Sequence, residues 1–168
     1  MNARRLLLPT VCSLLLVGGW ALAEVPVNAG FEKLKTLVGQ WEVTTPNGMH
    51  GTVKYELVSD GSAVLERISG DEHAMDMVTV YHPDGARLVM THYCSAGNQP
   101  RMRADAASGE VKKLDFRFLD ATNLAGPDAG HMHGLVVSFE DADHFSQEWR
   151  WLDHGKESAK VFHWARKK

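Results

Sequence analysis

Four side chains that can bind metals stand in two pairs, with the members of each pair two residues apart: His92 with Cys94, and His131 with His133. Residues two apart on a β-strand project to the same face, so each pair would present its groups together. Imidazole nitrogens and a thiolate suit tetrahedral zinc. The alternative is that the histidines line a cavity or rim and hydrogen-bond to backbone or carboxylate groups. We expect no cofactor as the first interpretation and zinc at these four residues as the second.

The loop at 97–101 combines a glycine, two side-chain amides, a proline and a guanidinium directly after the first pair. Arg101 could neutralise a carboxylate or phosphate of a ligand through paired hydrogen bonds, with Gln99 beside it. The alternative is a surface ion pair with Asp105 or Glu110. Loops at a barrel mouth often carry function, so both Gln99 and Arg101 are counted as candidate ligand-binding residues.

An aromatic stripe lies near the C-terminal end of the sequence. Trp149 and Trp151 alternate with charged residues and share a strand face with Phe145 and Gln147. The stripe either packs in a wall or, if it faces inward, lines a pocket for a flat or extended apolar ligand. The predicted ligand-binding set is His92, Cys94, Gln99, Arg101, His131, His133 and Trp149.

The sequence favours a binding protein over an enzyme. It contains no nucleophile elbow, phosphate loop, H-E-x-x-H motif or dinucleotide fingerprint. An acid–base pair of Glu66 or Glu148 with an inward histidine is conceivable, but no spacing selects it. The formal net charge of −3 does not fit a nucleic-acid partner.

The chain begins with the features of a secretory leader. Arg4 and Arg5 precede an apolar run over 6–17, and Ala21-Leu22-Ala23 forms a small-x-small cleavage site. Cleavage after Ala23 would leave residues 24–168 as one domain, in the periplasm or outside the cell. The length and the 44% hydrophobic composition fit one globular domain.

The cysteines agree with an exported domain. Cys12 lies in the leader, so Cys94 alone would remain and no intramolecular disulfide could form. No second apolar run approaches the ~18 residues of a membrane-spanning helix. We therefore expect no membrane span in the processed protein.

Turn signals divide most of the chain into short alternating segments, after one amphipathic helix over 29–38. The ten predicted strands span about 40–45, 50–58, 62–69, 75–82, 86–95, 101–107, 111–120, 131–140, 144–153 and 157–166. Regular short strands with tight turns predict an all-β, up-and-down antiparallel barrel, because closure removes the exposed edges. Polar residues mixed into the apolar faces predict either a ligand cavity or positions at the rim.

Gly39-Gln40-Trp41, directly after the helix, resembles the first strand of the calycin superfamily. The resemblance implies that Gly39 and Trp41 help to close the barrel and that Trp41 stacks on Arg166, with Arg150 as a second choice. Fatty-acid-binding proteins share the layout but insert a helical lid after the first strand, and no such lid is present here.

The remaining similarities are to two other groups of calycins. Nitrobindins bind haem through a histidine near the C-terminus, which would be His163, although their glycine-rich first hairpin is missing. The stretch over 91–102, with 131–133 and 143–145, looks like uncharacterised secreted lipocalin-like proteins.

Together these patterns predict a secreted barrel that binds a small apolar or amphipathic molecule in its lumen without catalysis. The alternative is a metal- or haem-binding barrel, possibly an enzyme, that uses His92, Cys94, His131 and His133, or His163. A third interpretation is an interaction module with a filled core.

Overall fold

The computed structural model describes residues 27–44, 50–70 and 76–168. The predicted leader with Cys12, and with it the cleavage site, lies outside the described residues. Over the described ranges the chain forms one short α-helix, one 3-10 turn and ten strands. These are α1 (Ala29–Lys35), β1 (Gly39–Thr44), β2 (His50–Val58), η1 (Ser59–Gly61), β3 (Ala63–Gly70), β4 (Met77–Asp84), β5 (Arg87–Tyr93), β6 (Gln99–Ala104), β7 (Lys113–Thr122), β8 (His131–Phe139), β9 (His144–Asp153) and β10 (Lys156–Arg166).

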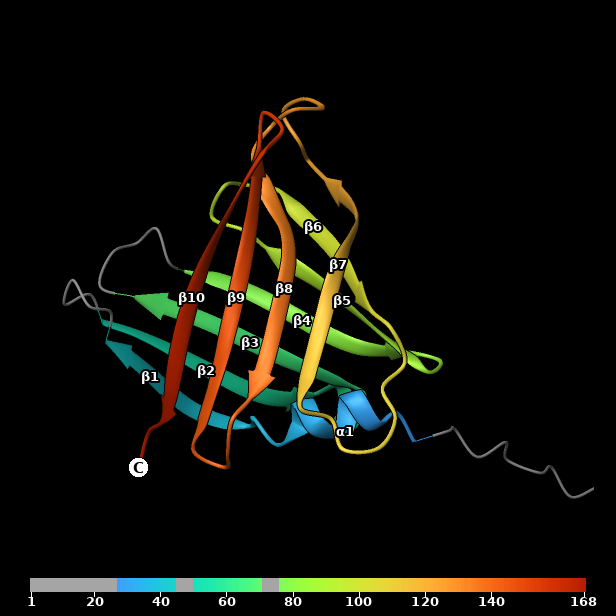
Figure 1. The fold of residues 1–168 in the computed structure, drawn as a ribbon, viewed down its shortest axis with the longest axis vertical. Coiled ribbons are helices and arrows are strands. Elements are labelled where there is room, and N and C mark those ends of the chain that lie inside the picture. The colour runs from blue at the N-terminus through green and yellow to red at the C-terminus, as the bar shows by residue number, and fades with distance from the viewer. Residues whose placement is uncertain (1–26, 45–49, 71–75) are drawn as a thin grey trace, which may run out of the picture.

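The strands form a closed barrel in chain order (Figure 1). Each strand pairs antiparallel with the next, and β1 closes the sheet against β10 with Trp41 opposite Arg166. Every strand therefore has two neighbours, although β1 and β10 pair only at Trp41–Arg166 and Glu42–Ala165 among the described residues. The predicted fold class, an up-and-down antiparallel barrel with one short N-terminal helix, is confirmed.

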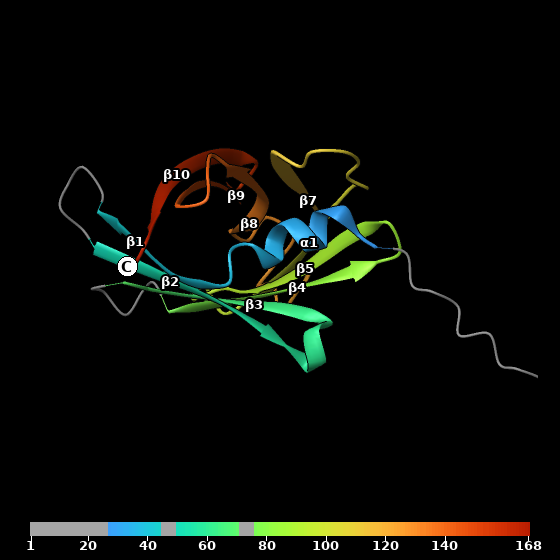
Figure 2. The ribbon, with the colours of Figure 1, turned by 90° about the horizontal axis from the view of Figure 1, so that it is seen from below.

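Helix α1 lies across one end of the barrel (Figure 2). Asn28 caps the helix by accepting a hydrogen bond from the backbone N–H of Phe31 at 2.9 Å. Its side-chain amide also donates to the carbonyls of Gly85 and Arg87, which ties the helix to the turn between β4 and β5. Within the described ranges, no helix has the length and hydropathy that a membrane crossing requires.

The helix is shorter than the predicted 29–38. It ends at Lys35, and the backbone N–H groups of residues 36–38 bond to carbonyls three residues earlier. Gly39 then adopts a φ of +135°, a conformation that side chains rarely tolerate. This tight turn brings Trp41 back under the helix, where its indole N–H donates to the carbonyl of Leu37 at 2.8 Å.

The half of the barrel beside α1 is filled with side chains. The ring of Phe145 lies edge-on to Trp41, 4.7 Å between centroids, and near Tyr55 at 5.9 Å. Leu34 from the helix is fully buried in the same cluster. The sequence predicted an interior in which polar residues mix with apolar ones. At this end of the barrel, that interior is a packed core.

A bulge in β8 changes the orientation predicted for one strand. Alternation would give His131, His133 and Leu135 a common face, but the pairing of β8 with β9 shifts between Met132 and Gly134. Leu135 is fully buried in the core, whereas Met132 is the residue of this bulge that lines the cavity described below. The strict two-residue period therefore does not hold across residues 131–135.

Candidate functional site

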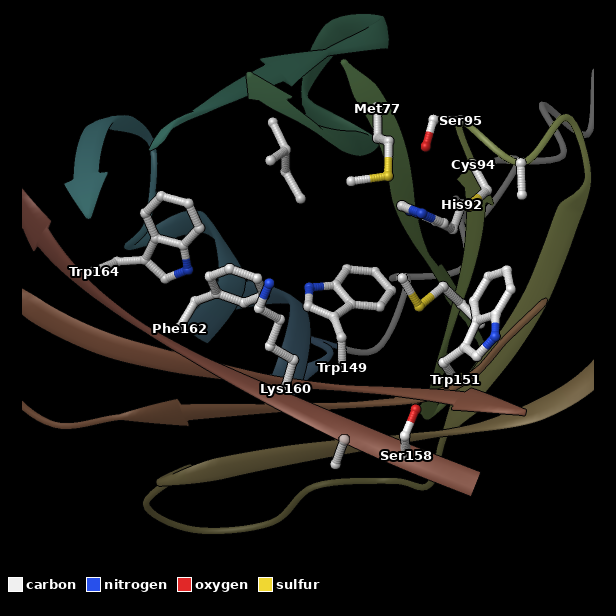
Figure 3. Close-up of a pocket in the computed structure, with 14 residues that line it drawn as sticks. Met77, His92, Cys94, Ser95, Trp149, Trp151, Ser158, Lys160, Phe162 and Trp164 are labelled. Carbon is white, nitrogen blue, oxygen red and sulfur yellow. The ribbon is translucent and has the colours of Figure 1, made fainter. Parts of the chain in front are cut away.

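A cavity of about 460 Å³ occupies the end of the barrel opposite α1 (Figure 3). Met77, which lines it, begins β4, whereas Asn28 bonds to the turn at the other end of that strand. The turn after β5 contributes Ser95 and Ala96 to the wall. The size falls within the range of small-molecule sites in proteins.

Aromatic side chains of β9 and β10 make up one wall of the cavity. Trp149 and Trp151 come from β9, and Phe162 and Trp164 come from β10. The rings of Phe162 and Trp164 are stacked with 6.0 Å between centroids. Gly130 leaves room for Trp151, because a Cβ at that position would lie 2.3 Å from the indole. Such a wall suits a flat apolar ligand.

The opposite wall carries His92, whose ring is fully buried. Its Nδ1 lies 2.9 Å from the Thr79 hydroxyl, and its ring packs on Trp149 with 4.6 Å between centroids. Burial lowers the pKa of His92 to about 4, so the imidazole is neutral at pH 7. Its other nitrogen, Nε2, has no hydrogen-bond partner among the described residues.

A buried carboxylate lies behind His92. Glu66 on β3 is fully buried and accepts hydrogen bonds from the Tyr81 hydroxyl and, at 2.7 Å, from Gln147 Nε2. Tyr55 and Thr79 are further hydrogen-bond partners of the carboxylate. Burial raises the pKa of Glu66, and these four bonds act in the opposite direction by favouring the charged form.

The orientation of this network is set by a group that can only donate. The indole N–H of Trp164 bonds to Gln147 at 3.0 Å, so the atom that faces it must be the amide oxygen. The Gln147 NH₂ group therefore points the other way, to Glu66 and to the Tyr55 hydroxyl at 3.0 Å. Trp164 lines the cavity, whereas Gln147, Glu66 and Tyr55 do not, so this network lies behind the cavity wall.

The mouth of the cavity is more polar. Ser95, Ser158 and Lys160 line it, and the Lys160 ammonium lies 5.5 Å from the centre of the Phe162 ring. Cys94 is partly buried in the same wall. The cavity therefore combines an apolar interior with a few polar groups at its rim.

His131 and His133 lie together but do not line this cavity. Their rings pack on Phe118, with 4.8 Å and 4.9 Å between centroids, and His133 Nδ1 lies 3.4 Å from His131 Nε2. His131 is buried and its Nδ1 is 2.8 Å from the carbonyl of Ala129. Of the two predicted pairs, His92 and Cys94 face the cavity together.

The predicted zinc site stays a prediction. In the part of the chain that the structure describes, no three His, Cys, Asp or Glu residues gather as a potential metal-binding group. The pairs His92–Cys94 and His131–His133 are not brought together as four ligands in these ranges.

Arg101 and Gln99 bond to neighbouring strand residues. The guanidinium of Arg101 forms a two-pronged ion pair with Asp120 on β7, where the sequence offered Asp105 or Glu110 as surface partners. Gln99 accepts a hydrogen bond from the Thr122 hydroxyl at 2.8 Å. Neither residue lines the cavity.

The residues predicted to close the barrel lie apart from the cavity, and so does the histidine that was predicted to bind haem. The Arg166 guanidinium is 4.0 Å from the centre of the Trp41 ring, which is the stack that the calycin resemblance implied. A Cβ at Gly39 would approach Arg166 within 2.9 Å. His163 is exposed and lies 3.5 Å from Glu140 in an ion-pair geometry. Haem binding through His163 stays a prediction.

Sequence reasoning missed the β10 part of the aromatic wall and most of the buried network. The alternation of Lys160, Phe162 and Trp164 was a usable signal, because these residues are two apart on one strand. Tyr55 and Thr79 carried no local signal, since their partners are distant in sequence.

Comparison of the sequence with protein-family models and with curated proteins gave no match. The closed ten-strand barrel is consistent with a calycin-like fold. The cavity is therefore the feature of the molecule that points to a function.

Proposed function

We propose that this protein is an exported barrel that binds a small, flat and largely apolar molecule in its lumen, without converting it. The observation that carries the proposal is the cavity of about 460 Å³ with an aromatic wall at the end of the barrel opposite α1. Apolar burial against aromatic side chains supplies affinity, and a few polar groups orient the ligand.

Three sulfur-bearing side chains make the wall adaptable. Met77, Met132 and Cys94 line the cavity together with the aromatic residues. A thioether on an unbranched chain adjusts to irregular shapes and makes favourable contacts with aromatic rings. This composition supports a ligand defined more by apolar shape than by charge.

The test is a titration with N-phenyl-1-naphthylamine, an uncharged aromatic probe whose emission rises in apolar surroundings. We expect a saturable increase with one site per chain. Met77→Trp replaces a thioether side chain of the cavity wall with a larger indole ring. It should weaken binding about tenfold or more, because the added volume competes with the probe. Thermal unfolding of the variant shows whether the barrel remains folded.

Val161→Trp is the matched control, because Val161 is half-exposed and does not line the cavity. It adds the same side chain to β10 and should leave binding unchanged. A non-saturable response in the original protein, or equal loss in both variants, would contradict the proposal.

A further inference from the structure

His92 presents a buried nitrogen whose hydrogen-bonding capacity is unused. Nε2 has no partner in the described ranges, and the imidazole belongs to the wall of the cavity. Buried polar atoms in folded proteins are nearly always hydrogen-bonded, so an exception requires an explanation. In Figure 3 the ring projects from β5 toward the interior of the cavity.

The buried network determines whether Nε2 donates or accepts. The Thr79 hydroxyl has one proton, and it is a hydrogen-bond partner of both the Glu66 carboxylate and His92 Nδ1. Thr79 is also a partner of the Tyr81 hydroxyl. When Thr79 donates its proton to one of these two neighbours, its own oxygen accepts from His92 Nδ1. The proton of the neutral imidazole is then on Nδ1, and Nε2 carries a lone pair.

We propose that the ligand of this cavity carries a hydrogen-bond donor, a hydroxyl or N–H group on a flat apolar ring system, which bonds to Nε2 of His92. This inference rests on the proposed function and specifies its ligand class. Thr79 and Glu66 act as positioning residues, because they hold the imidazole in the accepting tautomer without touching the ligand.

The ligand must displace one lining side chain to make this bond, because Nε2 is shielded from water. Met77 is suited to this movement, since it is only partly buried and its side chain has three rotatable bonds.

The binding test uses two probes that differ at one group. 2-Naphthol has a hydroxyl donor, whereas 2-methoxynaphthalene keeps the ring and the oxygen but cannot donate. We expect calorimetry at pH 7 to show about tenfold tighter binding of 2-naphthol, which corresponds to one hydrogen bond to a buried acceptor. His92→Phe, which keeps a planar ring without nitrogen, should remove this preference.

Lys160→Met tests the one charged side chain among the polar residues that line the cavity in the described ranges. It should leave the preference for 2-naphthol unchanged. If Lys160→Met removes the preference and His92→Phe does not, the hydroxyl bonds elsewhere and the inference is wrong. If both probes bind the original protein equally, the inference fails while lumen binding stands; if neither binds, the proposed function fails as well.

The tautomer can be measured independently of any ligand. Long-range ¹H–¹⁵N correlation spectra of the labelled protein distinguish a protonated from an unprotonated ring nitrogen. We expect His92 to be protonated at Nδ1 alone, and Thr79→Val to change that pattern. Protonation at Nε2 in the original protein would overturn the inference even if apolar probes bind.

Discussion

The buried imidazole of His92 should make the protein less stable as the pH falls. Its pKa is about 4 in the folded protein, against 6.5 for an unperturbed histidine. Between these values the unfolded chain binds a proton that the folded protein does not, so folding stability is lost as the pH falls through this window. Lowering the pH from 7 to 4.5 should therefore cost about 2 kcal/mol through His92 alone.

The measurement is urea unfolding at pH 7 and pH 4.5, followed by tryptophan fluorescence, for the original protein and for His92→Phe. The pKa of Glu66 is raised, so this carboxyl contributes stability below its unfolded pKa that is lost as the pH rises through its folded pKa. Glu66 therefore changes stability with pH in the opposite direction. Because Glu66 is present in both proteins, its contribution largely cancels when their pH dependences are compared.

We expect the original protein to lose about 2 kcal/mol more than His92→Phe over this change in pH. His163→Phe replaces an exposed histidine on a strand and should follow the original protein. Equal pH dependence in the original protein and His92→Phe would refute the account of a buried, neutral imidazole.

Two further predictions concern the aromatic wall and the closed end of the barrel, each with its own comparison variant. Gly130→Ala forces a Cβ against Trp151 and should cost about 1–3 kcal/mol in urea unfolding while altering probe affinity. Gly126→Ala, where a Cβ would meet open space, should change neither quantity. Arg166→Ala removes the stack on Trp41 and hydrogen bonds to two backbone carbonyls after α1, and should cost about 1–2 kcal/mol without changing probe affinity. Arg166→Lys should restore only part of the lost stability, because an ammonium lacks the planar set of N–H donors that a guanidinium provides.

The architecture could be predicted because its signals are local. Turn residues recur about every ten positions, and alternation on strands such as β7 places Leu114 and Phe116 on the buried face. His92 and Cys94, which are two residues apart, both line the cavity. Local periodicity therefore determined both the fold class and one part of the candidate site.

The remainder of the site depends on register between distant strands. Glu66 meets Gln147 across 81 positions of sequence, and no local pattern shows that Trp164 fixes the amide between them. A bulge likewise shifts the pairing of β8 between Met132 and Gly134, so strict alternation does not continue from His131 to Leu135. Bulges and buried polar networks arise from tertiary packing, which a single sequence does not display.

The central claim, that the end of the barrel opposite α1 is a binding site, can be tested with the tryptophan indole N–H signals of the protein itself. Trp149, Trp151 and Trp164 line the cavity, whereas Trp41 does not and instead bonds to the carbonyl of Leu37 next to α1. Titration with N-phenyl-1-naphthylamine should shift the ¹H–¹⁵N signals of the first three in a saturable manner and leave that of Trp41 in place. No saturable shift, or a shift of Trp41 as large as those of the cavity tryptophans, would contradict the account.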